Sequence, residues 1–162
     1  MKHVVVIGGG TGTFTVLSAL KKYPVNLSAI VTMADDGGST GMLRDQYGVL
    51  PTGDIRRALV ALSDSEGILR ELFNYRFKEG GLHGHSFGNL FLAALEKITG
   101  DFTTALREAS ELLNINGEVV PVTLDDVRLY AELEDGKMLR GETQIDIPRS
   151  SVRMPIKKIW LQ

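Results

Sequence analysis

The sequence lacks cysteine altogether. Disulfide bonds, thiolate nucleophiles and cysteine-ligated zinc are therefore excluded. Long hydrophobic runs are missing too. The apolar stretch at residues 4–7 is followed by glycines and is too short for a signal peptide, and no other stretch approaches the length of a membrane span. Neither sign of charge dominates, with 18 lysines and arginines against 20 aspartates and glutamates. We therefore expect neither nucleic acid nor membrane as a partner, and a cytoplasmic location.

The sequence does have the length of one domain and clustered glycines. Its 162 residues are 43% hydrophobic, which is enough for a sizeable core. The 18 glycines gather mainly at residues 8–12, 37–41 and 80–88. Glycines clustered between periodic segments indicate loops with a required backbone conformation, and not flexible linkers.

The N-terminal region predicts a strand, a helix and a second strand. Residues 3–7 are β-branched and apolar, which is typical of a buried strand. Residues 13–23 carry apolar side chains at helical spacing until Pro24 stops the pattern, and residues 27–33 form another apolar run. Such a βαβ unit has a right-handed crossover, so its two strands should be parallel.

Helical and extended patterns continue along the rest of the chain. We expect a long polar loop at 34–53, helices at 54–64, 66–77, 89–98 and 101–113, a strand at 118–123, an antiparallel hairpin of 127–133 and 138–147, and a last strand at 156–161. These segments predict one α/β domain with a mainly parallel sheet. Because no helix follows the last strand, we expect the N-terminal part of a longer domain, whose open sheet edge favours homo-oligomers.

The glycine-rich turn after the first strand is a candidate phosphate-binding loop. A strand that turns into a helix through glycines brings free N–H groups to the positive end of the helix, where an anion can approach the backbone. The alternative is a tight turn without a ligand. The dinucleotide fingerprint is imperfect, because Thr13 or Thr15 stands where its last glycine belongs, and the lysine of a Walker A loop is absent.

Two acidic segments follow. In DDGGSTG, Asp35 and Asp36 end the second strand, where a ribose hydroxyl or a magnesium ion brought by a nucleotide could bind, and a solvated turn is the alternative. Asp54 begins the next helix. Arg56 and Arg57 stand in its first turn, where the helix dipole disfavours them, so a carboxylate or a ligand phosphate is expected as their partner.

The segment HGHSFGNL gives another candidate. His85 and Asn89 lie at a helix start after a glycine-rich loop, where a polar or anionic ligand could bind. The simpler interpretation is that Ser86 caps the helix and His85 packs locally. No further ligand stands at zinc spacing from His83 and His85, so we expect no metal site made by the protein alone.

Several segments together resemble the YvcK branch of the CofD-like superfamily, often called the gluconeogenesis factor family. They are VVVIGGGTGTFTVLSALKKYP, IVTMADDGGSTGMLRDQYGVLPTGDIRRAL, FNYRF, GHSFGNLFLAAL and NGEVVPVT. The resemblance is collinear over nearly the whole chain, and the combination of ADDGGSTG with GHSFGN is specific. It implies a three-layer α/β/α, Rossmann-like fold. Family members continue into a second half after KIWL, so the likeness is to their N-terminal half.

The resemblance also implies a function. The other branch, 2-phospho-L-lactate transferase, moves a phospholactyl group from a guanosine-activated donor to a deazaflavin with magnesium. The YvcK branch is bacterial and cytoplasmic, binds UDP-sugars such as UDP-N-acetylglucosamine, and is required for normal cell shape on gluconeogenic carbon sources, with no established reaction. PTGDIRRA keeps only the aspartate of the transferases' PDLDT-like stretch, which favours the YvcK branch. Phe14 stands where many relatives have a smaller residue.

We therefore predict a nucleotide-sugar-binding regulatory protein. In the family, the glycine loop and the acidic loop line the nucleotide cleft, Asp54 matches an acidic residue near the deazaflavin, and His85 and Asn89 match a GHxxGN motif. The predicted ligand-binding residues are Gly8, Gly9, Gly10, Thr11, Gly12, Thr13, Asp35, Asp36, Gly37, Gly38, Ser39, Asp54, Arg57, His85 and Asn89. A CofD-type transferase of a nucleotide-activated phospho compound and an NAD(P)-binding oxidoreductase stay open as alternatives.

The pattern also predicts how these residues meet. Helix N-termini gather at the carboxyl edge of a parallel sheet, so Asp54, Arg57, His85 and Asn89 are expected in one pocket with the glycine turn. Arg57 lies three residues after Asp54 on the same helix face and should pair with it. Arg56, about 100° further round the helix, should then lie nearer solvent.

Overall fold

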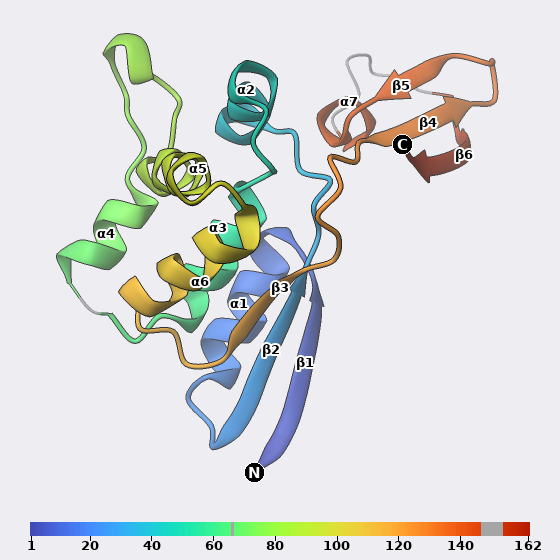
Figure 1. The fold of residues 1–162 in the computed structure, drawn as a ribbon. Helices are drawn as coiled ribbons and strands as arrows, with labels where there is room; N and C mark the ends of the chain where they lie inside the picture. The colour runs from blue at the N-terminus through green and yellow to red at the C-terminus, as the bar shows by residue number, and fades with distance from the viewer. Residues whose placement is uncertain (66, 147–153) are drawn as a thin grey trace.

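The computed structural model describes residues 1–65, 67–146 and 154–162 (Figure 1). Its elements are β1 (Lys2–Gly8), α1 (Gly10–Leu20), β2 (Val25–Val31), α2 (Gly38–Tyr47), α3 (Gly53–Leu62), α4 (Ile68–Asn74), the 3₁₀ turn η1 (Gly80–Leu82), α5 (Phe87–Thr99), α6 (Phe102–Leu112), β3 (Glu118–Pro121), β4 (Leu129–Leu133), β5 (Met138–Arg140), α7 (Glu142–Asp146) and β6 (Ile156–Leu161). The described strands form a parallel and an antiparallel sheet. The predicted α/β class, with both kinds of strand pairing, is confirmed.

The parallel sheet carries the main core. Its order is β1-β2-β3, and Val6, Ala29 and Val119 stand side by side across it. Helix α1 connects β1 to β2, and α3 packs against α1 and against β2 and β3. Leu27, Ala29 and Val31, alternate residues of β2, are buried in this core. The predicted parallel βαβ unit is therefore confirmed.

Strand β1 is not the fully buried strand that its apolar run predicts. Its burial alternates, so that Val4 and Val6 pack against the core while Val5 and Ile7 point away and are exposed, Ile7 to 75%. The prediction failed because a continuous apolar run is typical of a strand with both faces covered. Among the described residues, only the face with Val4 and Val6 is covered.

The predicted loop at residues 34–53 contains the helix α2. The helix was missed because it buries the polar side chains of Ser39, Thr40 and Arg44, so it shows no hydrophobic period. Tertiary hydrogen bonds stabilise it instead, including one from the Arg44 side chain to the Val127 carbonyl.

The other helices agree better with the sequence pattern. Ser86 and Asp101 cap α5 and α6 as predicted, each accepting the backbone N–H three residues later, and Gly100 ends α5 in the left-handed conformation. Helix α4 is shorter than predicted, and Glu66, the first residue of the predicted segment, lies outside the described residues.

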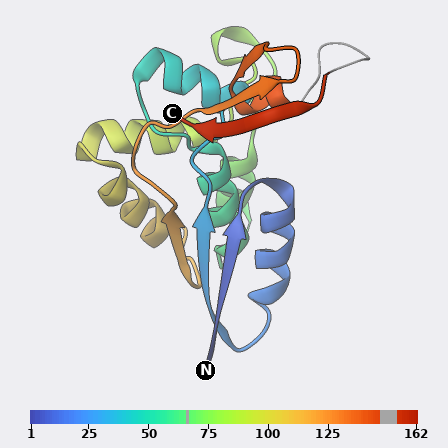
Figure 2. The same ribbon diagram turned by 90° about the vertical axis from the view of Figure 1, so that its right-hand side faces the viewer.

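The antiparallel sheet lies at the opposite end of the molecule from the N-terminus (Figures 1 and 2). Its order is β5-β4-β6, and β4 runs antiparallel to both neighbours. The second hairpin arm is shorter than predicted, because Gly141 turns the chain with a φ of 90° and α7 follows. Ile147, the end of the predicted arm, lies outside the described residues. Within the described residues, no helix is both long enough and apolar enough to cross a bilayer.

Candidate functional site

The turn between β1 and α1 needs several of its glycines for the fold itself. Strand β1 ends at Gly8, Gly9 precedes the first helical turn, and α1 begins at Gly10. Gly10 has a φ of 67°, in the left-handed region that favours glycine. Gly9 is extended, but a Cβ there would collide with the side chains of Asp54 and Thr32. Part of the glycine pattern is therefore explained by packing without any ligand.

Gly12 is a glycine that packing does not explain. It lies in the first turn of α1, and no atom is within 4 Å of the position that its Cβ would occupy. Alanine would be more stable than glycine in a helix by about 0.5–1 kcal/mol. Thr11 is exposed beside it, and the Thr13 hydroxyl donates to the Gly9 carbonyl at 3.0 Å. The start of α1 is thus bare and open to an approaching group.

Asp54 lies under the turn and fixes it to α3. Its Oδ1 accepts the Gly10 N–H at 2.9 Å, and the Arg57 Nη1 is 3.5 Å from the same oxygen, which confirms the predicted ion pair. Burial raises the pKa of Asp54, the Gly10 N–H opposes this, and the Asp35 carboxylate adds to the increase. Asp54 therefore holds one N–H of α1 as an anion would, and leaves those of Thr11 and later residues to a ligand.

The acidic loop is held by local contacts. Asp35 accepts the Gly37 N–H and the Thr40 hydroxyl, one on each carboxylate oxygen and both at 2.9 Å. Asp36 Oδ1 accepts the N–H and the hydroxyl of Thr143, at 3.0 and 3.1 Å, and so ties the loop to α7. Both carboxylates have structural partners, so these contacts fit the turn interpretation.

No group of three or more histidine, aspartate or glutamate side chains is placed to hold a metal ion among residues 1–65, 67–146 and 154–162. A magnesium ion held jointly with a nucleotide stays a prediction.

His85 and Asn89 reach the same loop from α5. The His85 Nδ1 is 3.2 Å from the Ser39 hydroxyl, and the Asn89 side chain donates to the Thr40 hydroxyl at 3.4 Å. A polar cavity of about 230 Å³ lies here, and it is lined by Asp35, Gly37, Gly38, Ser39, Thr40, Gly53, Arg56, Arg57, Arg76 and Asn89. Asp54 and His85 contact its lining residues from outside. The glycine turn adjoins it through Arg57, whose Nη1 is 3.8 Å from the Cβ position of Gly10.

Arg56 is buried, and the prediction that it lies nearer solvent than Arg57 was wrong. Arg56 is 7% exposed, whereas the Arg57 side chain is 43% exposed. The Arg56 Nε donates to Asn89 Oδ1 at 3.0 Å, and Nη1 donates to Asn74 Oδ1 at 2.9 Å. The helical spacing predicts the direction in which Arg56 points relative to Asp54. It does not predict that α4 and α5 pack over that side of α3 and bury the side chain.

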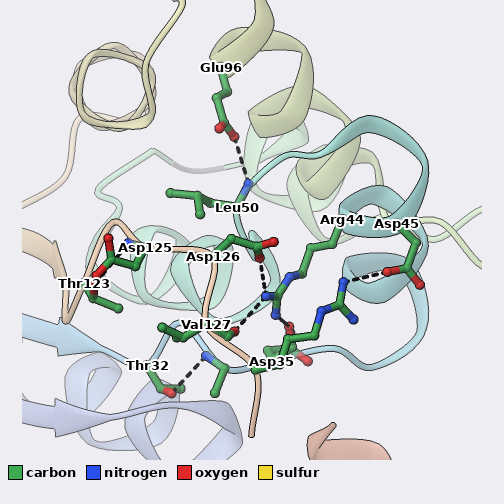
Figure 3. Close-up of polar contacts among 12 residues, drawn as sticks. Thr32, Asp35, Arg44, Asp45, Leu50, Glu96, Thr123, Asp125, Asp126 and Val127 are labelled. Carbon is green, nitrogen blue, oxygen red and sulfur yellow. Dashed lines mark hydrogen bonds and ion pairs between the residues drawn. The ribbon is translucent and has the colours of Figure 1, made fainter. Parts of the chain in front are cut away.

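Arg44 is a structural residue that the sequence pattern did not indicate. Its side chain is 1% exposed and lies between α2 and the segment that enters the second sheet (Figure 3). It donates to the Asp35 carbonyl at 3.0 Å, to the Val127 carbonyl at 2.7 Å and to the Asp126 carboxylate. Only a correct helix assignment for α2 would have placed this arginine in the last turn and facing inward.

A second, larger cavity lies elsewhere. It measures about 550 Å³ and runs along the open edge of β3 beside α6, with Leu106, Val119 and Pro121 among its lining. It contains none of the predicted site residues, and its shape is that of an uncovered sheet edge beside a helix. The polar cavity at α2 and the start of α1 are therefore the better candidates for the site.

These features define a Rossmann-like α/β protein with a glycine-rich turn and helix N-termini at the carboxyl edge of a parallel sheet. The chain belongs to the CofD family, because the family model described as 2-phospho-L-lactate transferase CofD matches residues 4–162.

Similar proteins point to one branch of that family. The putative gluconeogenesis factor of Nostoc sp. is 59% identical over 88% of this chain and 31% of its own length. The gluconeogenesis factor of Bacillus subtilis is 48% identical over 98% of this chain and 49% of its own. A crystal structure of a UPF0052 family member from Bacillus halodurans has a TM-score of 0.92 at 47% identity and covers 100% of this chain and 51% of that one. The predicted resemblance is confirmed, and the chain spans about half or less of the length of these relatives.

Alanine substitutions should separate the two kinds of glycine in the turn. Gly10→Ala must hold a side chain at a φ of 67° and should lower the free energy of unfolding by about 1–2 kcal/mol. Gly12→Ala should raise it by about 0.5–1 kcal/mol, because the site is open and helical. Urea denaturation measures both. A loss at Gly12 equal to that at Gly10 would mean that the fold requires both glycines.

The two neighbouring arginines should differ in their effect on stability. Arg56→Ala leaves Asn89 and Asn74 without their buried donor and should lower the free energy of unfolding by about 2 kcal/mol. Arg57→Ala, on the same helix, removes a half-exposed ion pair and should change it by less than about 1 kcal/mol. Thermal and urea unfolding of both variants check this, and the reverse order would contradict the burial of Arg56.

The free energy of unfolding should depend on pH through the raised pKa of Asp54. Because its folded pKa lies above the ordinary 3.8, the folded state binds this proton more tightly than the unfolded state. Its contribution is largest at low pH and is lost as pH rises through the raised pKa. The free energy of unfolding of the wild type, minus that of Asp54→Asn, should fall as pH rises above about 4. Urea titrations across pH measure this difference, and an increase with pH would contradict the raised pKa.

Proposed function

We propose that this chain supplies the nucleotide-binding part of a regulatory protein that binds a nucleotide sugar of the UDP-N-acetylglucosamine type. The observation that carries the proposal is the bare start of α1 beside the open space over Gly12. A pyrophosphate at residues 9–13 would accept the free N–H groups of the first helical turn and would be favoured by the helix dipole.

Arg57 and Thr11 are suited to assist at this place. The Arg57 guanidinium is half exposed and adjoins Gly10, so it can reach a phosphate while keeping Asp54 as a neighbour. The Thr11 hydroxyl is exposed in the first turn of the helix. A charged donor and a neutral donor would then flank the backbone N–H groups, as charge-assisted recognition of phosphate requires.

For the cellular role we rely on the names of the relatives. Proteins called gluconeogenesis factor are 48% identical to this chain or closer in Nostoc and Bacillus subtilis. We therefore propose a cytoplasmic protein that acts in carbon metabolism and in cell morphogenesis on gluconeogenic carbon sources. Regulation by binding fits the positions of Asp54 and His85, because both side chains are buried against protein partners.

A transferase of the CofD type is the second candidate. It is favoured by the description of the matching family and by the raised pKa of Asp54, since perturbed carboxyl groups beside a binding loop are typical of acid–base residues. The NAD(P) alternative is the weakest. Its fingerprint is imperfect, because Thr13 or Thr15 stands where the last glycine of the dinucleotide motif belongs.

Thermal shift measurements with UDP-N-acetylglucosamine, GDP and NAD test the three functions together. A ligand at a hundredfold excess over its Kd stabilises the folded state by about 2.7 kcal/mol, so a true ligand raises the Tm visibly. We expect the shift with UDP-N-acetylglucosamine and its loss in Gly12→Leu, which places a side chain over the helix start. Glu108→Leu, exposed on α6, is the matched control and should keep the shift.

The outcomes separate the candidates. A shift with GDP alone would favour the transferase, and a shift with NAD alone would favour the oxidoreductase. A shift with the UDP-sugar that persists in Gly12→Leu would place its pyrophosphate away from the start of α1.

A further inference from the structure

A groove lies between α2 and α5, away from the residues predicted to bind the nucleotide. The two helices pack side by side (Figure 1), and the cavity between them measures about 360 Å³. Its lining consists of Leu43 and Tyr47 from α2 and of Leu90, Ala93, Ala94 and Lys97 from α5. None of these six belongs to the predicted ligand-binding residues, so the groove needs an explanation of its own.

The sequence of the two helices explains why a groove forms here. On α5, the four lining residues stand at positions 90, 93, 94 and 97, a spacing that places them along one helix face. The two lining residues of α2 are four positions apart and likewise share a face. Ala93 and Ala94 stand in the middle of the α5 stripe, and their small side chains leave the space between the helices unfilled.

The walls of the groove are apolar and partly open to solvent. Leu43 and Ala93 are buried in a small core cluster with Val49, and Leu90 packs against this cluster. Ala94 is exposed at the rim. Covering apolar surface of this kind with another apolar group is favourable in water. The groove therefore favours an alkyl chain or an aromatic ring as its occupant.

The last residue of the α5 stripe adds a positive charge. Lys97 is exposed and makes no ion pair or hydrogen bond with a residue in 1–65, 67–146 or 154–162. The neighbouring Glu96 faces the loop after α2, where its carboxylate accepts the Leu50 N–H at 3.3 Å. The helix dipole favours a lysine in the last turn, but it leaves the three N–H donors of the ammonium group free.

A hydroxyl group lies at the same end of the groove as this lysine. The starts of α2 and α5 meet, because the Ser39 hydroxyl is 3.2 Å from the His85 Nδ1. Both helices lead away from this contact toward Tyr47 and Lys97, which line one groove. The Tyr47 side chain is exposed, and its hydroxyl can donate a second hydrogen bond to an anion beside Lys97. An apolar stretch thus ends in two donors, one of them charged.

Size and charge together select the class of occupant. A volume of about 360 Å³ lies within the range of about 300–1,000 Å³ that is typical of small-molecule pockets. A stable protein partner would need about 20–30 residues on this side, far more than line the groove. A single lysine matches a single negative charge, whereas a phosphate dianion would keep part of its charge uncompensated.

We propose that the groove between α2 and α5 binds a small amphipathic carboxylate, in which one carboxylate group is joined to an alkyl chain or an aromatic ring. The apolar part lies against Leu43, Leu90 and Ala93, and the carboxylate accepts hydrogen bonds from Lys97 and Tyr47. The proposal does not depend on the nucleotide-sugar function, because the two places share no residue.

An NMR titration of the ¹⁵N-labelled chain with octanoate tests the groove. The largest amide shifts should fall on Ala93, Ala94 and Lys97. Hexanoate should bind at least tenfold more weakly, because each buried CH₂ group changes the Kd about fourfold. Octylamine has the same chain with the opposite charge and should bind more weakly than octanoate. No binding of octanoate, shifts centred elsewhere, or equal affinity for octylamine would overturn the proposal.

Variants of α5 separate the apolar walls from the charge. Ala94→Phe fills the groove from its exposed rim and should abolish octanoate binding, whereas Ile98→Phe, exposed on the same helix outside the groove, is the matched control and should bind normally. Lys97→Ala should weaken binding about fivefold, as expected for a half-exposed ion pair, and Lys97→Glu should prefer octylamine. Normal octanoate binding by Ala94→Phe, or an unchanged preference in Lys97→Glu, would overturn the proposal.

The same spectra identify other occupants. Groove amides that shift when the protein is diluted without octanoate would mean that a second copy of the chain fills the groove, which would reject the carboxylate. Octanoate binding without a thermal shift from the UDP-sugar would reject the proposed function alone. A thermal shift from the UDP-sugar without octanoate binding would reject the groove alone.

Discussion

The contact between the Asp54 carboxylate and the β1–α1 turn is the interaction on which the rest of the site depends. It requires a glycine at position 9, where a Cβ would collide with that carboxylate, and it holds the Gly10 N–H at 2.9 Å. Because Asp54 lies in the first turn of α3, the same contact fixes the start of α1 against α3. Arg56 and Arg57 follow on α3, so their positions beside the cavity are set by this contact as well.

Around this contact, the carboxyl edge of the sheet is divided by charge. Asp35 and Asp36 organise the loop that leads into α2 and reach α7, while the arginines lie toward α4 and α5. Arg44 then joins α2 to the segment entering the second sheet, so that the two sheets are connected beside the site (Figure 3). A ligand with more than one anionic group would find separate positive regions here, at the start of α1 and among the arginines.

How much of this could be predicted from the sequence depends on the kind of interaction. The βαβ unit and the caps at Ser86 and Asp101 follow from local patterns, and the combined glycine motifs identified the family. Helix α2 could not be predicted, because its inward face is polar and is stabilised by residues distant in the sequence. The burial of Arg56 and the exposure of Ile7 were missed for a related reason: helical or strand spacing gives a direction, but not what packs there.

The most direct test of a ligand site at this edge of the sheet is an NMR titration of the ¹⁵N-labelled chain with UDP-N-acetylglucosamine. The largest amide shifts should fall on Thr11, Gly12 and Thr13, because the free N–H groups of α1 would donate hydrogen bonds to the pyrophosphate. Residues of the cavity between α6 and β3, such as Val119, should shift little. The largest shifts in that cavity, or no shifts at millimolar ligand, would contradict a nucleotide site at the glycine turn.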